Sequence, residues 1–173
     1  MSARVLRWLL VPVIVVPLAW LLATSLGRSV PRVGDPAPAF TLQTIDGETV
    51  SSESLTGRPY LLNFWASWCV PACVDEHPVL LEAQQRYGDR VAIVGVLYRD
   101  SPEGARDFLE TYGDGGWPHL SDPGERLAGE WGVLGPPETF LVDAQGRVAA
   151  RRIGPLTAAE LDRFMAPVAS VDR

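Results

Sequence analysis

The chain has 173 residues, with 21 acidic residues against 15 arginines, no lysine, and a formal net charge of −6 at pH 7. This length suits one domain with a short appendage. The acidic balance argues against a nucleic-acid partner, because phosphate binding needs a basic face.

The amino-terminal segment differs from the rest of the chain. Residues 8–26 form an uncharged run of 19, which is about the length that a helix needs to cross a bilayer. The run is longer than the apolar core of a cleaved signal peptide, and the candidate cleavage stretch at 23–25 is weak. We therefore expect an uncleaved membrane anchor over residues 1–27, with a cleaved secretory signal as the alternative. Either interpretation places the remainder outside the cytoplasm.

After the anchor, the composition predicts a Gly- and Pro-rich linker at 28–36 and one domain at 37–173. The first half of this domain contains turn signals between apolar runs. The elements expected there are a hairpin around Asp46-Gly47, a buried strand at 60–65, a helix at 71–87 and a buried parallel strand at 90–98.

The second half of the domain begins with a helix capped by Ser101, with Pro102 as its first residue. The elements expected after it are a loop at 115–123, a short helix at 125–131, a hairpin of strands at 136–143 and 147–152, and a last helix opened by a capping box at Thr157. This order predicts an α/β sheet with helices on both faces.

The two cysteines of the chain, Cys69 and Cys73, directly follow the strand at 60–65. If Cys69 lies at the amino terminus of the next helix, free N–H groups and the helix dipole lower the pKa of its thiol. Cys73 then lies one turn further on, with its Cα roughly 6 Å away. Disulfides accept Cα separations of about 4.4–6.8 Å, so the pair can close. Because so short a loop adds little stability, a function explains the pair better.

Several stretches resemble a known family. Trp65-Ala66-Ser67-Trp68-Cys69 resembles the approach to the active site of thioredoxin-fold proteins. The membrane-tethered TlpA/ResA/DsbE group is closer, through GDPAPAFTL at 34–42, VGVLYRDSPEGARDFL at 94–109, PPETFLVDAQGRV at 136–148 and RRIGPLT at 151–157. The last two stretches look most like the DsbE (CcmG) branch.

The resemblance implies a thioredoxin-like α/β fold with a central mixed sheet. It also implies a thiol–disulfide oxidoreductase of cytochrome c maturation, held in the inner membrane by one helix with its catalytic domain in the periplasm. The substrate would be the oxidised heme-binding cysteine pair of apocytochrome c, and the electrons would come from a membrane thiol carrier of the DsbD/CcdA type. No cofactor is expected.

The resemblance also implies roles for individual catalytic residues. Cys69 matches the exposed nucleophile, Cys73 the buried resolving cysteine, and Pro137 the cis-proline that faces the pair. Glu76 matches a glutamate that moves protons to and from the buried cysteine, since a partly desolvated carboxyl has a raised pKa. Asn63 stands where thioredoxins carry a buried aspartate, which leaves Glu76 as the best candidate for the proton acceptor.

Substrate contacts are expected from Trp68 and Pro136. Trp68 is interpreted as a lid over Cys69, with stacking on the substrate as the alternative. Pro136 departs from the family pattern, because a proline has no N–H to offer a substrate strand. The third residue between the cysteines departs from it as well.

Another class of function, copper(I) carriage, stays open. Sco-type copper chaperones share the fold, the Cys-x-x-x-Cys spacing and a distant histidine, and soft thiolates suit Cu(I). His77 and His119 are the candidate ligands, but the residues that flank the cysteines are not those of Sco proteins. A peroxidase would need a threonine beside the reactive cysteine, which is absent, and a redox-inactive interaction domain is a further alternative.

Overall fold

The computed structural model describes Val16 and residues 30–169, and its folded unit begins at Pro31. The strands in this part of the chain are β1 (Thr41–Gln43), β2 (Thr49–Ser51), β3 (Tyr60–Trp65), β4 (Ala92–Leu97), β5 (His119–Leu120), β6 (Glu138–Val142) and β7 (Val148–Ile153). The helices are the 3-10 helix η1 (Ser52–Leu55) and the α-helices α2 (Ala72–Tyr87), α3 (Pro102–Tyr112), α4 (Arg126–Trp131) and α5 (Ala158–Ala169).

Five strands form one mixed sheet in the order β5-β4-β3-β6-β7. The strand β3 lies at its centre, parallel to β4 and antiparallel to β6. All six residues of β3 are buried, which is why its sequence is nearly continuously apolar. The predicted α/β class and the mixed sheet are therefore confirmed.

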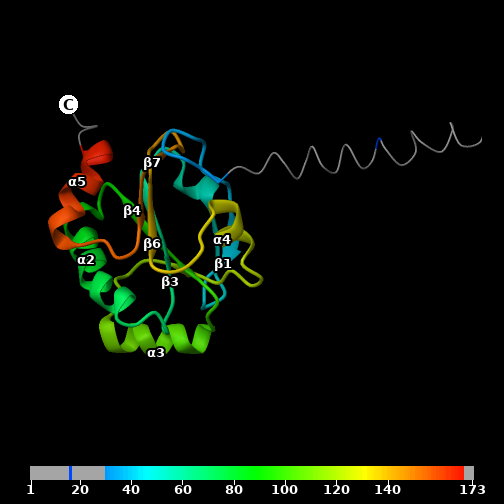
Figure 1. The fold of residues 1–173 in the computed structure, drawn as a ribbon, viewed down its shortest axis with the longest axis vertical. Coiled ribbons are helices and arrows are strands. Elements are labelled where there is room, and N and C mark those ends of the chain that lie inside the picture. The colour runs from blue at the N-terminus through cyan, green and yellow to red at the C-terminus, as the bar shows by residue number, and fades with distance from the viewer. Residues whose placement is uncertain (1–15, 17–29, 170–173) are drawn as a thin grey trace, which may run out of the picture. The chain divides into compact units, whose positions relative to one another are not determined.

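Helices cover both faces of this sheet (Figure 1). On one face, α2 and α5 bury an apolar cluster that includes Leu61 and Ile93. On the other, α4 places Trp131 against Phe64 and Phe140, with ring centroids 6.4 and 4.7 Å away. The sheet is thus fixed from both sides, and its strand ends are rigid supports for a site.

Local signals set the helix boundaries as predicted. The Ser101 hydroxyl accepts a hydrogen bond from the Gly104 N–H at 3.1 Å, and α3 ends at Gly113. Glu160 reaches back to Thr157 at the start of α5, where its carboxylate accepts from the Thr157 N–H at 3.4 Å and from the Thr157 hydroxyl at 2.8 Å, which is the glutamate half of the predicted capping box. The hairpin of β1 and β2 around Asp46-Gly47 is confirmed too.

The prediction of an uninterrupted loop at 115–123 is wrong, because β5 lies within it. This strand pairs in parallel with β4, with Gly95 opposite His119. Two paired residues are too few to produce a recognisable alternation of apolar and polar residues. The strand nevertheless matters, since it brings His119 into the core of the domain.

The predicted anchor at 1–27 lies outside the described residues, Val16 excepted. Within the part of the chain that the structure describes, no helix has the length and apolar character needed to cross a bilayer. The folded unit begins earlier than residue 37. The Gly34 N–H donates to the Val148 carbonyl at 2.8 Å, and Pro36 bridges to Arg147.

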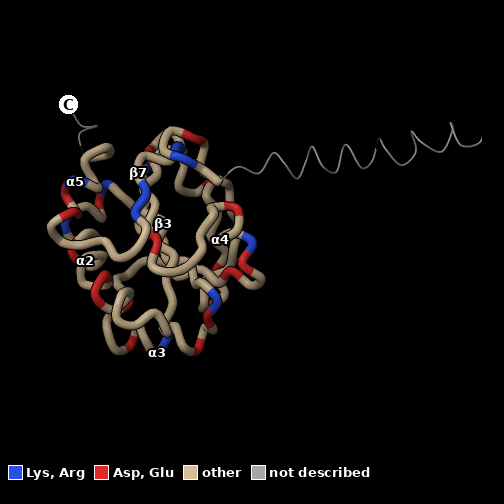
Figure 2. The backbone as a smooth tube through the Cα atoms, in the orientation of Figure 1, with Lys and Arg blue, Asp and Glu red and all other residues tan. Residues whose placement is uncertain are grey.

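Charged residues of both signs are dispersed over the domain, and a basic stretch lies on β7 (Figure 2). Most ion pairs are solvent-exposed, as is Arg99 with Glu125 at 2.6 Å. Solvent screens such pairs, so they add little to stability. The apolar layers, and not the surface charges, therefore hold the scaffold of the site.

Candidate active site

The cysteine pair lies at the end of the central strand. After Trp65 closes β3, a turn carries the chain into α2, and Cys69 and Cys73 form a disulfide across this junction. Their Cα atoms are 5.3 Å apart, close to the preferred separation for a disulfide. The predicted pairing of the two cysteines is confirmed.

Cys69 lies three residues before the first residue of α2, so the supposition that it begins the helix is not met. The first helical residue is Ala72, and its N-cap position is occupied by Pro71. The peptide bond between Val70 and Pro71 is cis. The two cysteines still lie one helical turn apart, because the Cys73 N–H donates to the Cys69 carbonyl at 2.8 Å. Val70 and Pro71, between the two cysteines, therefore belong to the turn before the helix.

The two sulfur-bearing residues are both largely covered. Cys69 is 7 % exposed and Cys73 3 % exposed. Both belong to an apolar cluster with Trp65, Leu97 and Phe108. The expectation of an exposed Cys69 is thus corrected: in the disulfide form its side chain is buried.

The outer rim of this site is apolar and accessible. Trp68 is 53 % exposed, Val70 69 % and Leu134 92 %. The indole of Trp68 donates to the Arg99 carbonyl at 3.0 Å and lies 6.5 Å from the ring of Tyr98. Trp68 is thus fixed at its polar edge while its apolar face remains open. Its role in substrate binding stays a prediction.

The segment that enters β6 lies beside the cysteine turn. Pro137 is buried, and the Pro136–Pro137 peptide bond is cis, as the resemblance implied. The pairing of β3 with β6 sets Glu138 opposite Phe64, so Pro137 comes next to the end of β3. The Pro137 carbonyl accepts from the Gly154 N–H at 3.0 Å. The catalytic role of Pro137 and the substrate contact of Pro136 stay predictions.

A partly buried ion pair supports this segment, and sequence reasoning missed it. The Arg151 guanidinium donates to Glu138 Oε1 at 2.5 Å and to the Gly132 carbonyl at 3.2 Å. Burial raises the pKa of the Glu138 carboxyl, and Arg151 opposes that effect. The pair ties the turn after α4 to the first residue of β6.

The buried side of the site is a polar cluster around Glu76, which is 1 % exposed. Its carboxylate accepts hydrogen bonds from Asn63 Nδ2 at 2.9 Å, from the Thr139 hydroxyl at 3.2 Å and from the Leu156 N–H at 2.8 Å. Burial raises the pKa of the Glu76 carboxyl, although these three donors partly offset the effect. Such a group exchanges a proton more readily near neutral pH than an ordinary glutamate.

A small cavity of about 10 Å³ lies between this cluster and Cys73. The residues lining it include Asn63, Cys73, Glu76, His119 and Trp65. The structure thus brings the predicted proton acceptor and the resolving cysteine to one cavity. The geometry suits proton exchange behind a reactive disulfide.

The two histidines lie on the same side of the sheet, each bonded to a backbone carbonyl. His77 Nε2 pairs with the Gly113 carbonyl at 2.7 Å, and His119 Nε2 with the Asp114 carbonyl at 3.1 Å. Burial lowers the pKa of both imidazoles. Among the described residues, no three His, Cys, Asp or Glu side chains are placed to share a metal ion.

Several members of the buried cluster had no clear signal in the sequence. Asn63 was recognised only as the lack of an acid, yet its amide joins Glu76 to Thr139. The Leu156 N–H is a backbone group, which no residue type reveals. The one usable clue in the sequence is a polar residue within an otherwise apolar strand, such as Thr139 in β6, because such a residue is buried together with its neighbours.

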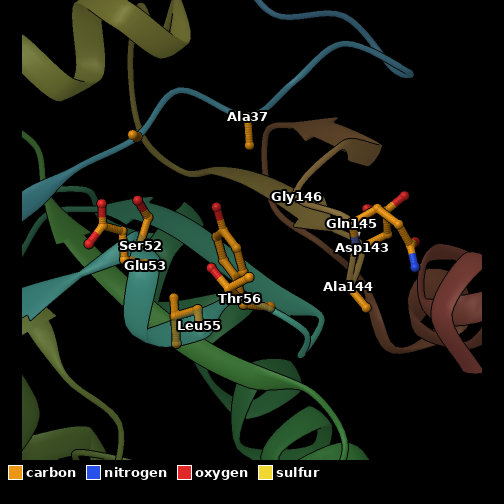
Figure 3. Close-up of a pocket in the computed structure, with 11 residues that line it drawn as sticks. Ala37, Ser52, Glu53, Leu55, Thr56, Asp143, Ala144, Gln145 and Gly146 are labelled. Atoms are coloured by element: carbon orange, nitrogen blue, oxygen red, sulfur yellow. Dashed lines mark hydrogen bonds between the residues drawn. The ribbon is translucent and has the colours of Figure 1, made fainter.

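A larger pocket of about 240 Å³ lies elsewhere in the domain. Figure 3 shows Ser52, Glu53 and Leu55 on one side of it and the turn from Asp143 to Gly146 on the other. None of the predicted site residues lines this pocket. Its side chains form no arrangement of acid, base and nucleophile, so it takes no part in the chemistry argued below.

Comparison with known proteins agrees with this geometry. The family model described as Redoxin matches residues 32–164. The chain is 39 % identical over 130 residues to the thiol:disulfide interchange protein DsbE of Allochromatium vinosum, covering 74 % of this chain and 70 % of that protein. It is 41 % identical over 126 residues to the thiol:disulfide interchange protein HelX of Rhodobacter capsulatus, covering 72 % and 69 %.

Solved structures share the fold. A putative thiol:disulfide interchange protein DsbE from Chlorobium tepidum superposes with a TM-score of 0.70 at 29 % identity, covering 79 % of this chain and 95 % of that one. The domain therefore has the thioredoxin-like fold that the resemblance implied.

Proposed function

The chain belongs to the Redoxin family, and we propose that it acts outside the cytoplasm as a thiol–disulfide oxidoreductase that reduces the heme-binding cysteine pair of apocytochrome c. Thiol–disulfide exchange itself follows from the family, whose members named above are thiol:disulfide interchange proteins. The observation that carries the proposal is the disulfide between Cys69 and Cys73, which lies between an apolar rim and the buried carboxyl of Glu76.

The reaction begins from the dithiol form. The Cys69 thiolate attacks one sulfur of the substrate disulfide, whose S–S bond breaks as the mixed disulfide forms. The departing substrate thiolate takes up a proton. Cys73 then loses its proton, and its thiolate attacks the Cys69 sulfur, which releases the second substrate sulfur as a thiolate that also takes up a proton. Two electrons pass to the substrate, and the protein is left with its Cys69–Cys73 disulfide.

Glu76 serves the second half of this reaction. Cys73 is buried, so the proton it releases needs an acceptor inside the domain. Glu76 lines the same cavity, and burial raises the pKa of its carboxyl toward the range in which a proton is readily taken up. Once it takes up that proton, the Glu76 carboxyl is neutral. The interior therefore does not hold two negative charges when the Cys73 thiolate forms.

The cellular setting is part of the proposal. The uncharged run at 8–26 supports a single-pass anchor in the inner membrane, with the domain on the periplasmic side. A membrane thiol carrier of the DsbD/CcdA type would return the protein to its dithiol form. The resemblance to the DsbE branch at 136–157 supports apocytochrome c as the substrate.

Substrate trapping tests the proposal. In the Cys73→Ser variant the mixed disulfide is not resolved. Partners should therefore accumulate as covalent adducts on Cys69, and a reducing agent should release them. We expect apocytochrome c among the adducts from membranes of a strain that makes c-type cytochromes. The double variant Cys69→Ser/Cys73→Ser is the control and should trap nothing. Trapped partners without apocytochromes, together with normal cytochrome c levels in a deletion strain, would remove the maturation role.

A further inference from the structure

Two buried nitrogen atoms near the cysteines have no hydrogen-bond partner in the protein. They are Trp65 Nε1 and His119 Nδ1, on side chains 5 % and 6 % exposed. A buried polar group without a partner destabilises the folded state. Both residues line the cavity that Cys73 also lines. The two atoms therefore call for an explanation that includes the cavity.

Gly95 shows that the two nitrogens converge. A Cβ atom on Gly95 would lie 2.7 Å from His119 Nδ1 and 2.8 Å from Trp65 Nε1. Any residue other than glycine would crowd both atoms. The missing side chain on β4 thus lets the indole and the imidazole lie against the same point of the backbone, so their two nitrogens are close to one another.

The polarity of the two nitrogens is fixed. An indole N–H can only donate. The Asp114 carbonyl can only accept, so His119 Nε2 carries a hydrogen in its 3.1 Å bond to that oxygen. Burial lowers the pKa of the imidazole and keeps the ring neutral. In a neutral imidazole with a protonated Nε2, Nδ1 is an acceptor. A donor and an acceptor therefore face one space.

We propose that this space holds one ordered water molecule, which accepts from Trp65 Nε1, donates to His119 Nδ1, and directs its second hydrogen at the Cys73 sulfur. The cavity of about 10 Å³ is near the minimum volume for one water. Glu76 already accepts three hydrogen bonds, whereas a Cys73 thiolate brings a new negative charge to the cavity. The water stabilises that thiolate, and His119 is the positioning residue that sets the direction of the water.

The inference concerns the reactivity of Cys73, so it rests on the resolving role given to this residue under the proposed function. Other charges also act on the cavity. Glu76 and His77 face it from α2, Asp46 and Asp114 lie near His119, and Arg152 lies near Glu76. They are the same in every variant described below, so a difference between His119 variants reports His119.

Two substitutions at His119 separate its two hydrogen bonds. His119→Gln places an amide near Nε2, so it keeps the bond to the Asp114 carbonyl and loses the acceptor for the water. His119→Asn places a polar atom near Nδ1, so it keeps that acceptor and loses the bond to Asp114. The pair is matched, because each variant removes one bond and retains the other.

The measurement is the titration of Cys73 in the full chain carrying Cys69→Ser, followed by the ¹³Cβ signal of labelled cysteine. We expect His119→Gln to lower the Cys73 thiolate fraction at pH 7 about tenfold, one pKa unit. His119→Asn should stay within about twofold of the parent. Trp65→Phe, which removes the donor to the water, should lower the Cys73 thiolate fraction about threefold. This variant tests the inference if His119→Gln does not fold.

A nuclear Overhauser contact between the Trp65 indole proton and a long-lived water checks the water directly. Equal titrations for the parent and for the His119→Gln and Trp65→Phe variants would overturn the inference, and so would the lack of a bound water. The titration needs no substrate. A failed trapping experiment therefore leaves this inference standing, and a failed titration leaves the proposed substrate standing.

Discussion

The two sides of the cysteine pair are built differently. On the outer side, Trp68, Val70 and Leu134 present apolar side chains to solvent. On the inner side, Asn63 and Glu76 are polar, buried and held by hydrogen bonds. The outer side can adapt to a partner because Val70 and Leu134 are mostly exposed and Trp68 is held only at its polar edge. The inner side must keep its geometry, because each buried donor and acceptor depends on another.

This difference predicts where a substitution affects folding and where it affects reaction with a partner. A buried hydrogen-bonded cluster is stable only when complete, so the loss of one member leaves the others unsatisfied. An exposed apolar residue contributes little to folding, but it contributes buried area once a partner covers it. The three predictions below separate these behaviours, beginning with the largest effect.

Asn63→Leu should break the inner cluster. The change removes the amide that donates to Glu76 at 2.9 Å and to Thr139 at 2.8 Å. We expect the free energy of unfolding at pH 7 to fall by about 3 kcal/mol, because one lost bond goes to a carboxylate. Urea unfolding measures it. Thr111→Val, which removes an exposed hydroxyl bond to the Asp107 carbonyl, is the control and should cost less than about 0.5 kcal/mol. A comparable loss in both variants would contradict the comparison.

Glu76→Gln should change how stability depends on pH. Burial raises the pKa of Glu76 above its ordinary value of 4.5, so the folded state holds the proton more tightly than the unfolded state. The stability that this group contributes is complete below the unfolded pKa and is lost as pH rises through the folded pKa. Glutamine does not titrate. The unfolding free energy of the parent minus that of the variant should therefore decrease from pH 4 to pH 8, and an increase would show that the pKa is lowered instead.

Trp68→Ala should have the smallest effect on folding. The side chain is half exposed and keeps one bond to the Arg99 carbonyl, so we expect a loss below about 1 kcal/mol. Trp131→Ala, at a fully buried position, should cost about 3–5 kcal/mol. The rate of reduction of a protein disulfide should fall roughly fivefold with Trp68→Ala, as apolar contact area is lost. Reduction of a small disulfide should not change, and a similar fall for both substrates would assign Trp68 to the chemistry.

Much of the fold could be predicted because its signals are local. The apolar run of β3, the Ser101 cap and the Thr157 capping box each act within a few residues of the chain. The strand β5 could not be predicted, since its two residues owe their conformation to pairing with β4. Long-range pairing of so short a segment leaves no periodic pattern.

The residues of the site, too, could be predicted only where the signal is local. The cysteine pair and Glu76 could be named from the sequence, and the structure places Cys73 and Glu76 around one cavity. The position of Cys69 ahead of the helix could not be predicted, because it depends on how Val70 and Pro71 are accommodated. The link from Arg151 to Glu138 was missed for a similar reason, since both residues look like ordinary surface charges until β6 and β7 pair.

The bond from the Leu156 N–H to Glu76 Oε1, 80 residues away along the chain, has a practical consequence. An amide proton resonance shifts when the group that accepts its hydrogen bond changes charge. The Leu156 signal in a ¹⁵N-labelled sample is therefore a built-in indicator of the ionisation of the glutamate. Following this one resonance while the protein is reduced and reoxidised would report when Glu76 gains or loses its proton, without a chemical label on either cysteine.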